Sequence, residues 1–190
     1  MKVQVLQETG LEWAKLGTSL SRLQPLENMD TVCNNLADKD GGHNKFLEFI
    51  SVWLDITAPR YFWQQLSTYR IGNSWLSEST MYTITKNLLS QSNFEQHVCE
   101  ELLNYLNNLI TIYQKSNNKE YKNQIFNEIK NNLPEGFLQR RVMVSNYKSL
   151  RNIILQRRNH KLYEWHYFCD QVMQQLTHPE MVVKDYVCDR

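Results

Sequence analysis

The alternation of apolar and polar residues predicts short strands in three parts of the chain. Residues 3–7 (VQVLQ) alternate well enough to form the first of them. Within residues 46–59, four alternate positions would line one buried face of a second strand: Ile50, Val52, Leu54 and Ile56. Residues 142–145 (VMVS) predict a third strand, whereas the polar run DKDGGHN at residues 38–44 predicts a loop.

Helical periodicity covers more of the chain than strand periodicity does. It predicts helices over residues 12–23, 60–70, 94–114, 116–132 and part of 145–165, with a further helix from about Tyr163. The first has an apolar stripe of Trp13, Leu16, Leu20 and Leu23. The longest has a stripe of Val98, Leu102, Leu106, Leu109 and Tyr113. The last would bury Trp165, Phe168, Val172 and Leu176.

These elements predict an α+β fold in which helices pack around a small mixed sheet. Strands and helices do not alternate strictly, so a doubly wound parallel sheet is not expected. A chain of 190 residues is long enough to bury a sizeable core and short enough for one domain, spanning residues 1–190.

Composition narrows the class of protein. A formal net charge of +1 argues against a broad nucleic-acid or membrane-binding surface. No apolar run reaches the roughly 18 residues of a membrane span, and the first residues, MKVQVLQETGLEW, do not resemble a signal peptide. Four widely spaced cysteines are better explained as free thiols than as zinc ligands: Cys33, Cys99, Cys169 and Cys188. We therefore expect a cytoplasmic protein.

The segment SNYKSLRNIILQRRNHKLYEW, residues 145–165, contains a conflict between charge and burial. On a helix, Leu150 and Ile154 form an apolar stripe, and Asn146 and Arg157 fall on the same face. Burying a guanidinium alone costs several kcal/mol. Arg157 therefore either extends its charge to solvent or meets an anion. That anion is a buried glutamate in one interpretation and a ligand carboxylate, phosphate or ionised pyrimidine in the other. The segment alone leaves both interpretations open and slightly favours the first.

Two further segments hold candidate binding residues. In QQLSTYRIGNSWLSESTMY, residues 64–82, a helix is predicted to end at Tyr69-Arg70, and serine and threonine hydroxyls follow. Such a loop either holds an anion or simply connects two elements. In GGHNKFLE, His43 lies in a glycine-containing loop, where a lone histidine is usually a surface residue. No common catalytic motif accompanies these segments.

Taken together, these segments resemble the flavin-dependent thymidylate synthases. That family shows GHxTPxEH, a helix ending in RHR, a loop ending in ESTRY, an Arg-x-x-Leu-Pro segment and a helix containing N-x5-N-x4-R. The corresponding segments here are GGHNKFLEF, APRYFWQQLSTYR, SESTMY, KNNLP and SNYKSLRNIILQR. The tail QRRNHKLYEWHYFC resembles a divergent branch that is associated with phages and Gram-positive bacteria.

The resemblance implies a reaction and its participants. The family methylates dUMP to dTMP: FAD in its reduced form supplies a hydride, methylenetetrahydrofolate supplies the carbon, and NADPH re-reduces the flavin. The nucleotide binds at a subunit interface, usually in a homotetramer. The resemblance therefore implies a homo-oligomeric, cytoplasmic enzyme (in the host cytoplasm if phage-encoded) that acts on dUMP or a related pyrimidine nucleotide, without membrane or nucleic-acid partners.

The resemblance also implies roles for individual residues. Arg157 matches the arginine that contacts the uracil and favours its ionised form, which makes it the candidate catalytic residue. The positions that match flavin contacts are His43, Arg70, Asn146 and Asn152, with Tyr69 where a flavin-stacking histidine is usual. The positions that match nucleotide contacts are Gln65, Ser79, Thr80 and Lys130, with Ser79 against the phosphate and Lys130 contributed by another subunit.

Several family residues are replaced in this chain. RHR has become Thr68-Tyr69-Arg70, and Met81 takes the arginine position of ESTRY. Lys45 and Phe49 replace the threonine and the second histidine of GHxTPxEH. Each lost charge-assisted contact is worth about 1.5–3 kcal/mol, and the basic residues that could compensate are Lys45, Arg60, Arg140 and Arg141. The substitutions leave an alternative open, in which the chain is a catalytically degenerate nucleotide-binding protein of the same fold.

Overall fold

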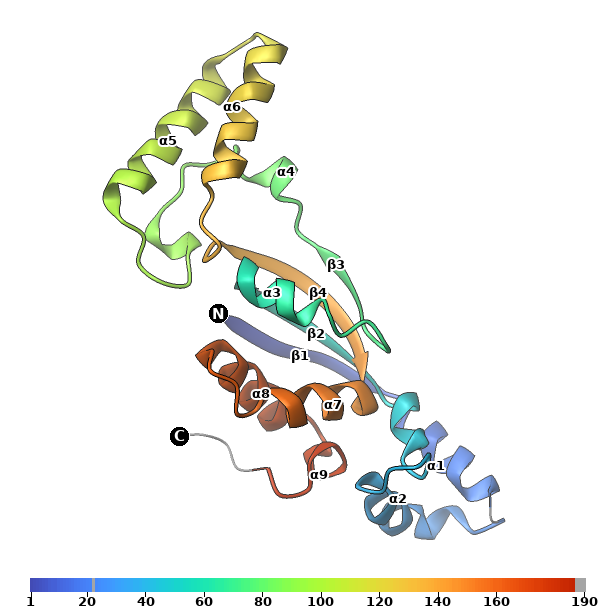
Figure 1. Cartoon of the computed structure of the whole chain (residues 1–190). Coiled ribbons are helices and arrows are strands. Elements are labelled where there is room, and N and C mark those ends of the chain that lie inside the picture. The colour runs from blue at the N-terminus through green and yellow to red at the C-terminus, as the bar shows by residue number, and fades with distance from the viewer. Residues whose placement is uncertain (22, 187–190) are drawn as a thin grey trace. The chain divides into compact units, whose positions relative to one another are not determined.

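The computed structural model describes residues 1–21 and 23–186 and contains a four-stranded sheet (Figure 1). The strands are β1 (Lys2–Thr9), β2 (Ser51–Pro59), β3 (Ser74–Ser77) and β4 (Leu138–Asn146). They are antiparallel throughout and lie in the order β1-β2-β4-β3. In β2 the side chains of Val52, Leu54 and Ile56 are fully buried, as their alternation predicted. The expected α+β class is confirmed.

The chain packs as two compact units, which we describe separately. The sheet unit contains residues 2–56, 66–76 and 142–186, and the hairpin unit contains Met1 and residues 57–65 and 77–141. Each unit is assembled from segments that are far apart in the sequence. The single domain expected from chain length stays a prediction.

In the sheet unit, helices from both ends of the chain surround a common core. They are α1 (Leu11–Leu20), α2 (Met29–Ala37), α7 (Tyr147–Arg157), α8 (Tyr163–Gln175) and α9 (Pro179–Val182), with short 3-10 turns at Leu26–Asn28 and Lys45–Phe49. Helix α8 packs against β1 and carries the fully buried Trp165 and Phe168. Its apolar stripe was predicted correctly.

The start of α7 is tied to β1 and to the residue that precedes β2. The backbone N–H of Tyr147 donates to the carbonyl oxygen of Ile50 at 3.0 Å, and its hydroxyl donates to the carboxylate of Glu8. Burial, followed by the hydrogen bond to Glu8, raises the pKa of Tyr147 well above its ordinary value of 10. The tyrosine is therefore a neutral anchor that fixes where α7 begins.

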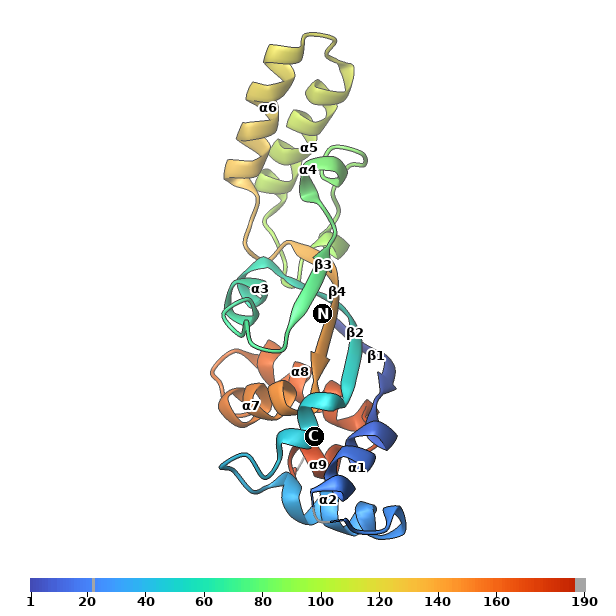
Figure 2. The same cartoon turned by 90° about the vertical axis from the view of Figure 1, so that its right-hand side faces the viewer.

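The hairpin unit is built around two long helices that run side by side, α5 (Glu100–Lys115) and α6 (Lys119–Asn132) (Figures 1 and 2). It also contains α3 (Arg60–Leu66), α4 (Thr80–Thr83) and a 3-10 turn at Gln91–Asn93. Leu106 and Ile110 of α5 and Ile129 of α6 are fully buried in its core. Both helices were predicted from the sequence, and α6 ends before Leu133 as expected.

Four sequence-based expectations differ from the structure. An apolar stripe usually faces the core, but the stripe predicted for the first helix faces outward: Trp13 is 69% exposed and Leu20 is 65% exposed. The small residues Ala14 and Ser19 pack inward instead, because α1 lies close to α2 and to the turn Lys45–Phe49. Leu23, predicted as the last apolar residue of this helix, lies beyond its end with a positive φ of 52°.

The predicted helix over residues 60–70 is also shorter than expected. Helix α3 ends at Leu66, and the backbone N–H of Tyr69 closes a turn onto the carbonyl oxygen of Leu66 at 3.1 Å. Tyr69 and Arg70 therefore belong to a loop. The serine-rich stretch that follows contains the short strand β3 and the single turn α4 rather than a continuous loop.

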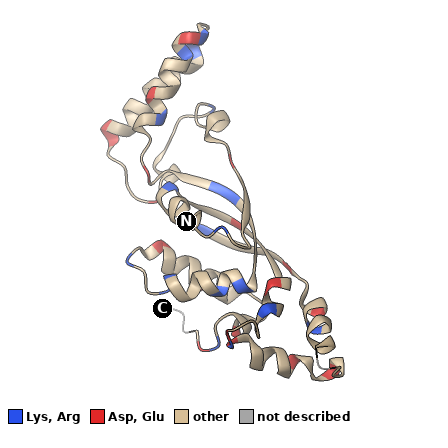
Figure 3. Cartoon of the chain, turned by 45° about the vertical axis from the view of Figure 1, so that its right-hand side comes forward, with Lys and Arg blue, Asp and Glu red and all other residues tan. Residues whose placement is uncertain are grey.

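None of the helices within the described residues is both long and apolar enough to cross a membrane. Basic and acidic residues occur along elements of both units (Figure 3). Cys33 and Cys169 are buried, Cys99 is exposed, and all three are free thiols. Cys188, which was also expected to be free, lies outside the described residues.

Candidate functional site

The candidate site begins at α7, whose two ends carry two of the predicted residues. Asn146 is the N-cap: its Oδ1 accepts a hydrogen bond from the backbone N–H of Ser149 at 2.8 Å. Leu150 and Ile154 are fully buried, which fixes the rotation of the helix. Arg157 is the last residue of the helix, where a positive charge interacts favourably with the helix dipole.

The guanidinium of Arg157 is held by two aromatic residues. Its Nε donates to the hydroxyl oxygen of Tyr69 at 2.7 Å. Its central carbon lies 5.4 Å from the centre of the Tyr69 ring and 4.9 Å from the centre of the Trp165 ring. Both distances are within the range of a cation–π contact. The two rings also meet each other edge to face, with 6.2 Å between their centres.

This environment orients Arg157 without neutralising its charge. Among residues 1–21 and 23–186, no carboxylate pairs with the guanidinium, and its two terminal nitrogens have no hydrogen-bond partner. The interpretation in which Arg157 pairs with a buried glutamate is therefore wrong. The half-buried cation remains available to an anion from outside the chain.

Polar side chains extend from Tyr69 along the exposed side of α7. The Tyr69 hydroxyl donates to Oε1 of Gln156 at 3.0 Å, and Nε2 of Gln156 donates to Oδ1 of Asn152 at 2.9 Å. The structure thus connects three residues that the resemblance singled out: Tyr69, Asn152 and Arg157. We call these residues, together with Gln156 and Trp165, the Arg157 cluster.

The loop that carries Tyr69 is fastened to the start of α7. Oγ of Ser149 donates to the carbonyl oxygen of Ile71 at 2.8 Å, and Oγ of Ser145 donates to Oδ1 of Asn73 at 2.6 Å. The close approach requires a glycine at position 72, because a Cβ there would lie 2.3 Å from Oγ of Ser149. Its φ of 72° is also one that other residues rarely adopt. Arg70 is exposed, and its guanidinium has no hydrogen-bond or ion-pair partner in the described part of the chain.

The hairpin unit holds the other predicted residues. Nζ of Lys130, on α6, donates to Oγ1 of Thr80 at 2.7 Å. Ser79 precedes α4 and is exposed, and Gln65 is half-buried near the end of α3. Burial, followed by the nearby charge of Arg60, lowers the pKa of Lys130 below its ordinary value of 10.5. Lys130 has no carboxylate partner among the residues that the structure describes.

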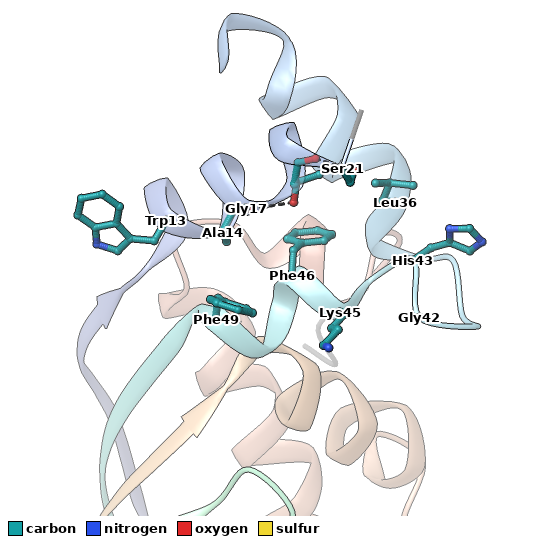
Figure 4. A pocket seen from close by; sticks show the side chains of 11 residues that line it. Trp13, Ala14, Gly17, Ser21, Leu36, Gly42, His43, Lys45, Phe46 and Phe49 are labelled. Atoms are coloured by element: carbon teal, nitrogen blue, oxygen red, sulfur yellow. Dashed lines mark hydrogen bonds between the residues drawn. The ribbon is translucent and has the colours of Figure 1, made fainter. Parts of the chain in front are cut away.

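His43 lies at the rim of a pocket in the sheet unit. The pocket has a volume of about 420 Å³ and lies between α1, α2 and the turn Lys45–Phe49. Phe46 and Phe49 face its interior, whereas His43 points outward (Figure 4). Neither a hydrogen bond nor a ring contact connects His43 to the Arg157 cluster within the described residues.

The structure adds one residue that the sequence did not assign to the site. Trp165 was predicted only as part of a buried stripe, but its ring is also a face for Arg157. The two residues belong to different helices, and they meet because the chain turns between Arg157 and Tyr163. The spacing of eight residues gave no signal for this contact. No group of three or more potential metal ligands occurs in the described segments.

Comparisons with known proteins identify a family and a shared fold. The sequence profile of a family described as thymidylate synthase complementing protein matches residues 7–179. A crystal structure of the flavin-dependent thymidylate synthase of Helicobacter pylori, complexed with FAD and dUMP, is similar with a TM-score of 0.74 and 20% identity. A second structure of that enzyme with FAD and dUMP gives 0.76 and 19%. Both matches cover 97% of this chain and 98% of the other. No curated protein sequence matches significantly.

Proposed function

This chain belongs to the thymidylate synthase complementing protein family, and from this premise we propose that it is a flavin-dependent enzyme that methylates dUMP or carries out a closely related modification of a pyrimidine nucleotide. The observation that carries the proposal is the Arg157 guanidinium, which Tyr69 and Trp165 orient and which no carboxylate among the described residues neutralises. A positive charge fixed in this way is suited to an anionic ring. In the reaction, Arg157 would hold the pyrimidine and favour its ionised form.

Lys130 and Thr80 are our candidates for contacts to the nucleotide phosphate. A phosphate is the natural partner for the half-buried ammonium of Lys130, which lacks a carboxylate among the described residues. The hydroxyls of Ser79 and Thr80 and the amide of Gln65 offer further hydrogen bonds. Following the resemblance, we propose that Lys130 acts on a nucleotide held by another protomer.

The residues of the sheet unit fit a flavin in their chemistry. Tyr69 offers a half-buried ring, Asn152 an exposed amide and Arg70 an exposed guanidinium that pairs with none of the residues the structure describes. These groups could stack on an isoalloxazine, hydrogen-bond its edge and balance the charge of a diphosphate. Asn146, at the start of α7, and His43, at the rim of the pocket, complete the proposed FAD-binding set. When bound and reduced, the flavin would supply the hydride, with methylenetetrahydrofolate and NADPH as co-substrates.

The proposal has a direct test. We expect purified protein to show flavin absorbance, either as isolated or after incubation with FAD, and to bind dUMP in a calorimetric titration. The Arg157→Ala variant should bind dUMP at least tenfold more weakly, because a charge-assisted hydrogen bond contributes about 1.5–3 kcal/mol. Growth of a thymidine auxotroph that expresses the chain would support dUMP as the substrate. Protein that takes up neither FAD nor dUMP would refute the proposal.

A second candidate function is nucleotide binding without catalysis. Thr68 and Met81 favour this function, because each takes a position where the family has an arginine. Both residues are exposed, Met81 to 66%. If the chain only binds the nucleotide, dUMP should stabilise the protein against thermal denaturation, and the protein should not take up FAD. The absorbance measurement therefore separates the two functions.

We also propose a homo-oligomer, with a tetramer as the first expectation, since the family builds its ligand sites between subunits. We propose a cytoplasmic location, which would be the cytoplasm of the host if the chain is encoded by a phage. We expect no nucleic-acid partner.

A further inference from the structure

An arginine that recognises an anionic ligand must be oriented but not neutralised. A carboxylate at its Nε would fix the guanidinium well, but it would also compete with the ligand for the positive charge. Arg157 is held differently, by a phenol hydroxyl and two aromatic faces. All of these partners are uncharged.

We propose that Tyr69 and Trp165 are positioning residues for Arg157, holding its guanidinium so that both terminal nitrogens face the ligand with their full charge. The inference rests on the proposed function, because it takes Arg157 to be the residue that meets the nucleotide. It assigns to Tyr69 a role that acts through Arg157, in addition to any contact of its ring with the flavin.

The hydroxyl of Tyr69 fixes the rotation of the guanidinium. It accepts a hydrogen bond from Nε of Arg157 at 2.7 Å and donates one to Oε1 of Gln156 at 3.0 Å. Because the hydroxyl proton is committed to Gln156, an oxygen lone pair points to Nε. A phenylalanine at this position would keep the ring but lose both hydrogen bonds.

Trp165 supplies a rigid face for the same guanidinium. Its side chain is fully buried and makes edge contacts with Phe168, at 5.8 Å between ring centres, and with His160, at 6.3 Å. A ring packed on several sides cannot swing away from Arg157. Tyr69 and Trp165 thus restrict the guanidinium from two elements, the loop before β3 and helix α8.

The first experiment removes single atoms. Tyr69→Phe should weaken dUMP binding about tenfold in a calorimetric titration, the size expected for a hydrogen bond to a charged group. Tyr163→Phe is the matched control: it removes the same hydroxyl from an exposed residue of the same unit and should leave binding unchanged. Unchanged dUMP affinity in Tyr69→Phe would overturn the inference, provided that Arg157→Ala weakens binding.

Coupling between the two residues separates positioning from a general structural role. In an Arg157→Lys background, which lacks the Nε–H and the planar fork, Tyr69→Phe should cause no further loss of dUMP affinity. Two losses that simply add would mean that Tyr69 acts independently of Arg157, which would overturn the inference. Unchanged binding in Arg157→Ala would refute the proposed role of Arg157 itself.

Trp165 is tested by a pair of variants, since any substitution of a buried tryptophan lowers stability. Trp165→Phe keeps an aromatic face and Trp165→Leu does not, and thermal denaturation shows whether both fold. We expect Trp165→Leu to bind dUMP about fivefold more weakly than Trp165→Phe, in line with the size of a cation–π contact. Equal affinities in the two folded variants would remove Trp165 from the inference.

A measurement on the free protein does not depend on the ligand. In a nitrogen–proton NMR spectrum, the Nε–H of Arg157 should be ordered and protected from exchange, and it can be assigned by its absence in Arg157→Lys. Tyr69→Phe should abolish the protection, whereas Tyr163→Phe should not. An unprotected Nε–H in the unmodified protein would overturn the inference even if dUMP binds.

Discussion

At the scale of single residues, the backbone conformation of Gly72 supports the Arg157 cluster, because the loop that carries Tyr69 passes close to α7 at this glycine. Its positive φ lets the loop after Tyr69 lie against the N-cap of α7. A Cβ at this position would meet Oγ of Ser149 at 2.3 Å and Nδ2 of Asn146 at 2.8 Å. Both steric crowding and backbone strain therefore oppose any other residue.

Comparing two glycines separates these effects. Gly41→Ala should lower the free energy of unfolding by about 1–2 kcal/mol from backbone strain alone, because a Cβ there meets nothing within 4 Å. Gly72→Ala should lose at least about 1 kcal/mol more, from overpacking against α7. Urea denaturation of the two variants measures the difference, and equal losses would contradict the close approach described here.

Lys130 gives a second prediction at the scale of residues. Lys130→Met should weaken dUMP binding about tenfold or more. Lys115→Met removes an exposed lysine of the same unit and should leave dUMP binding unchanged.

The same lysine predicts a pH dependence of stability. Because burial lowers the pKa of Lys130, the unfolded chain holds this proton to higher pH than the folded chain does. The free energy of unfolding should therefore rise as the pH increases through the folded-state pKa towards 10.5. A variant that retains this alkaline rise would contradict the assignment.

At the scale of elements, α5 and α6 form the part of the chain with the clearest sequence signal. Their apolar residues recur over several turns, and most of the expected stripe lies in or against the core of the hairpin unit. Other elements gave weaker signals. Strand β3 is four residues long and mostly exposed, so its pairing with β4, rather than its own sequence, makes it a strand. Helix α2 buries Met29, Cys33 and Ala37, whose mixed sizes hide the periodicity.

The packing of the helical hairpin can be tested on one helix. Leu106→Ala should lower the free energy of unfolding by about 2–5 kcal/mol, because Leu106 is fully buried between α5 and α6. Ile112→Ala, on the same helix, should cost about 0.5 kcal/mol or less, since Ile112 is 39% exposed. Chemical denaturation gives both values. Similar losses for the two variants would mean that α5 is rotated from the position described.

At the scale of the whole molecule, the outward face of α1 is apolar and yet exposed in the single chain. Trp13, Leu16 and Leu20 are exposed together on one helix, and an apolar patch of this kind usually marks an interaction surface. The helical spacing of these three residues was predicted from the sequence. Periodicity reports that a face is apolar and does not report which surface covers it.

The proposed assembly follows at the same scale. Light scattering should give a mass of at least twice the 22.7 kDa of one chain. Leu16→Glu combined with Leu20→Glu should lower the measured mass. Leu88→Glu combined with Tyr121→Glu introduces the same two charges at exposed positions of the hairpin unit and serves as the control. A parent protein that is monomeric at all concentrations would argue against both the assembly and a ligand site between subunits.

The candidate site was only partly accessible from the sequence. The spacing of Asn146, Asn152 and Arg157 is local, so one helix was enough to relate them. The neighbours that give Arg157 its environment come from a distant loop and from the next helix, at Tyr69 and Trp165. Contacts of this kind depend on tertiary packing and have no repeat in the sequence.

The hydrogen bonds from Arg157 through Tyr69 and Gln156 to Asn152 all run in one direction. Each group gives its proton to the next, so the carbonyl oxygen of Asn152 already accepts one hydrogen bond, and its NH₂ group has no acceptor in the described part of the chain. The terminal nitrogens of Arg157 can likewise only donate. We therefore expect this edge of the protein to favour molecules rich in lone pairs, such as a deprotonated imide or a ring with adjacent carbonyl groups, and to discriminate against amino-substituted rings that present N–H groups in the same places.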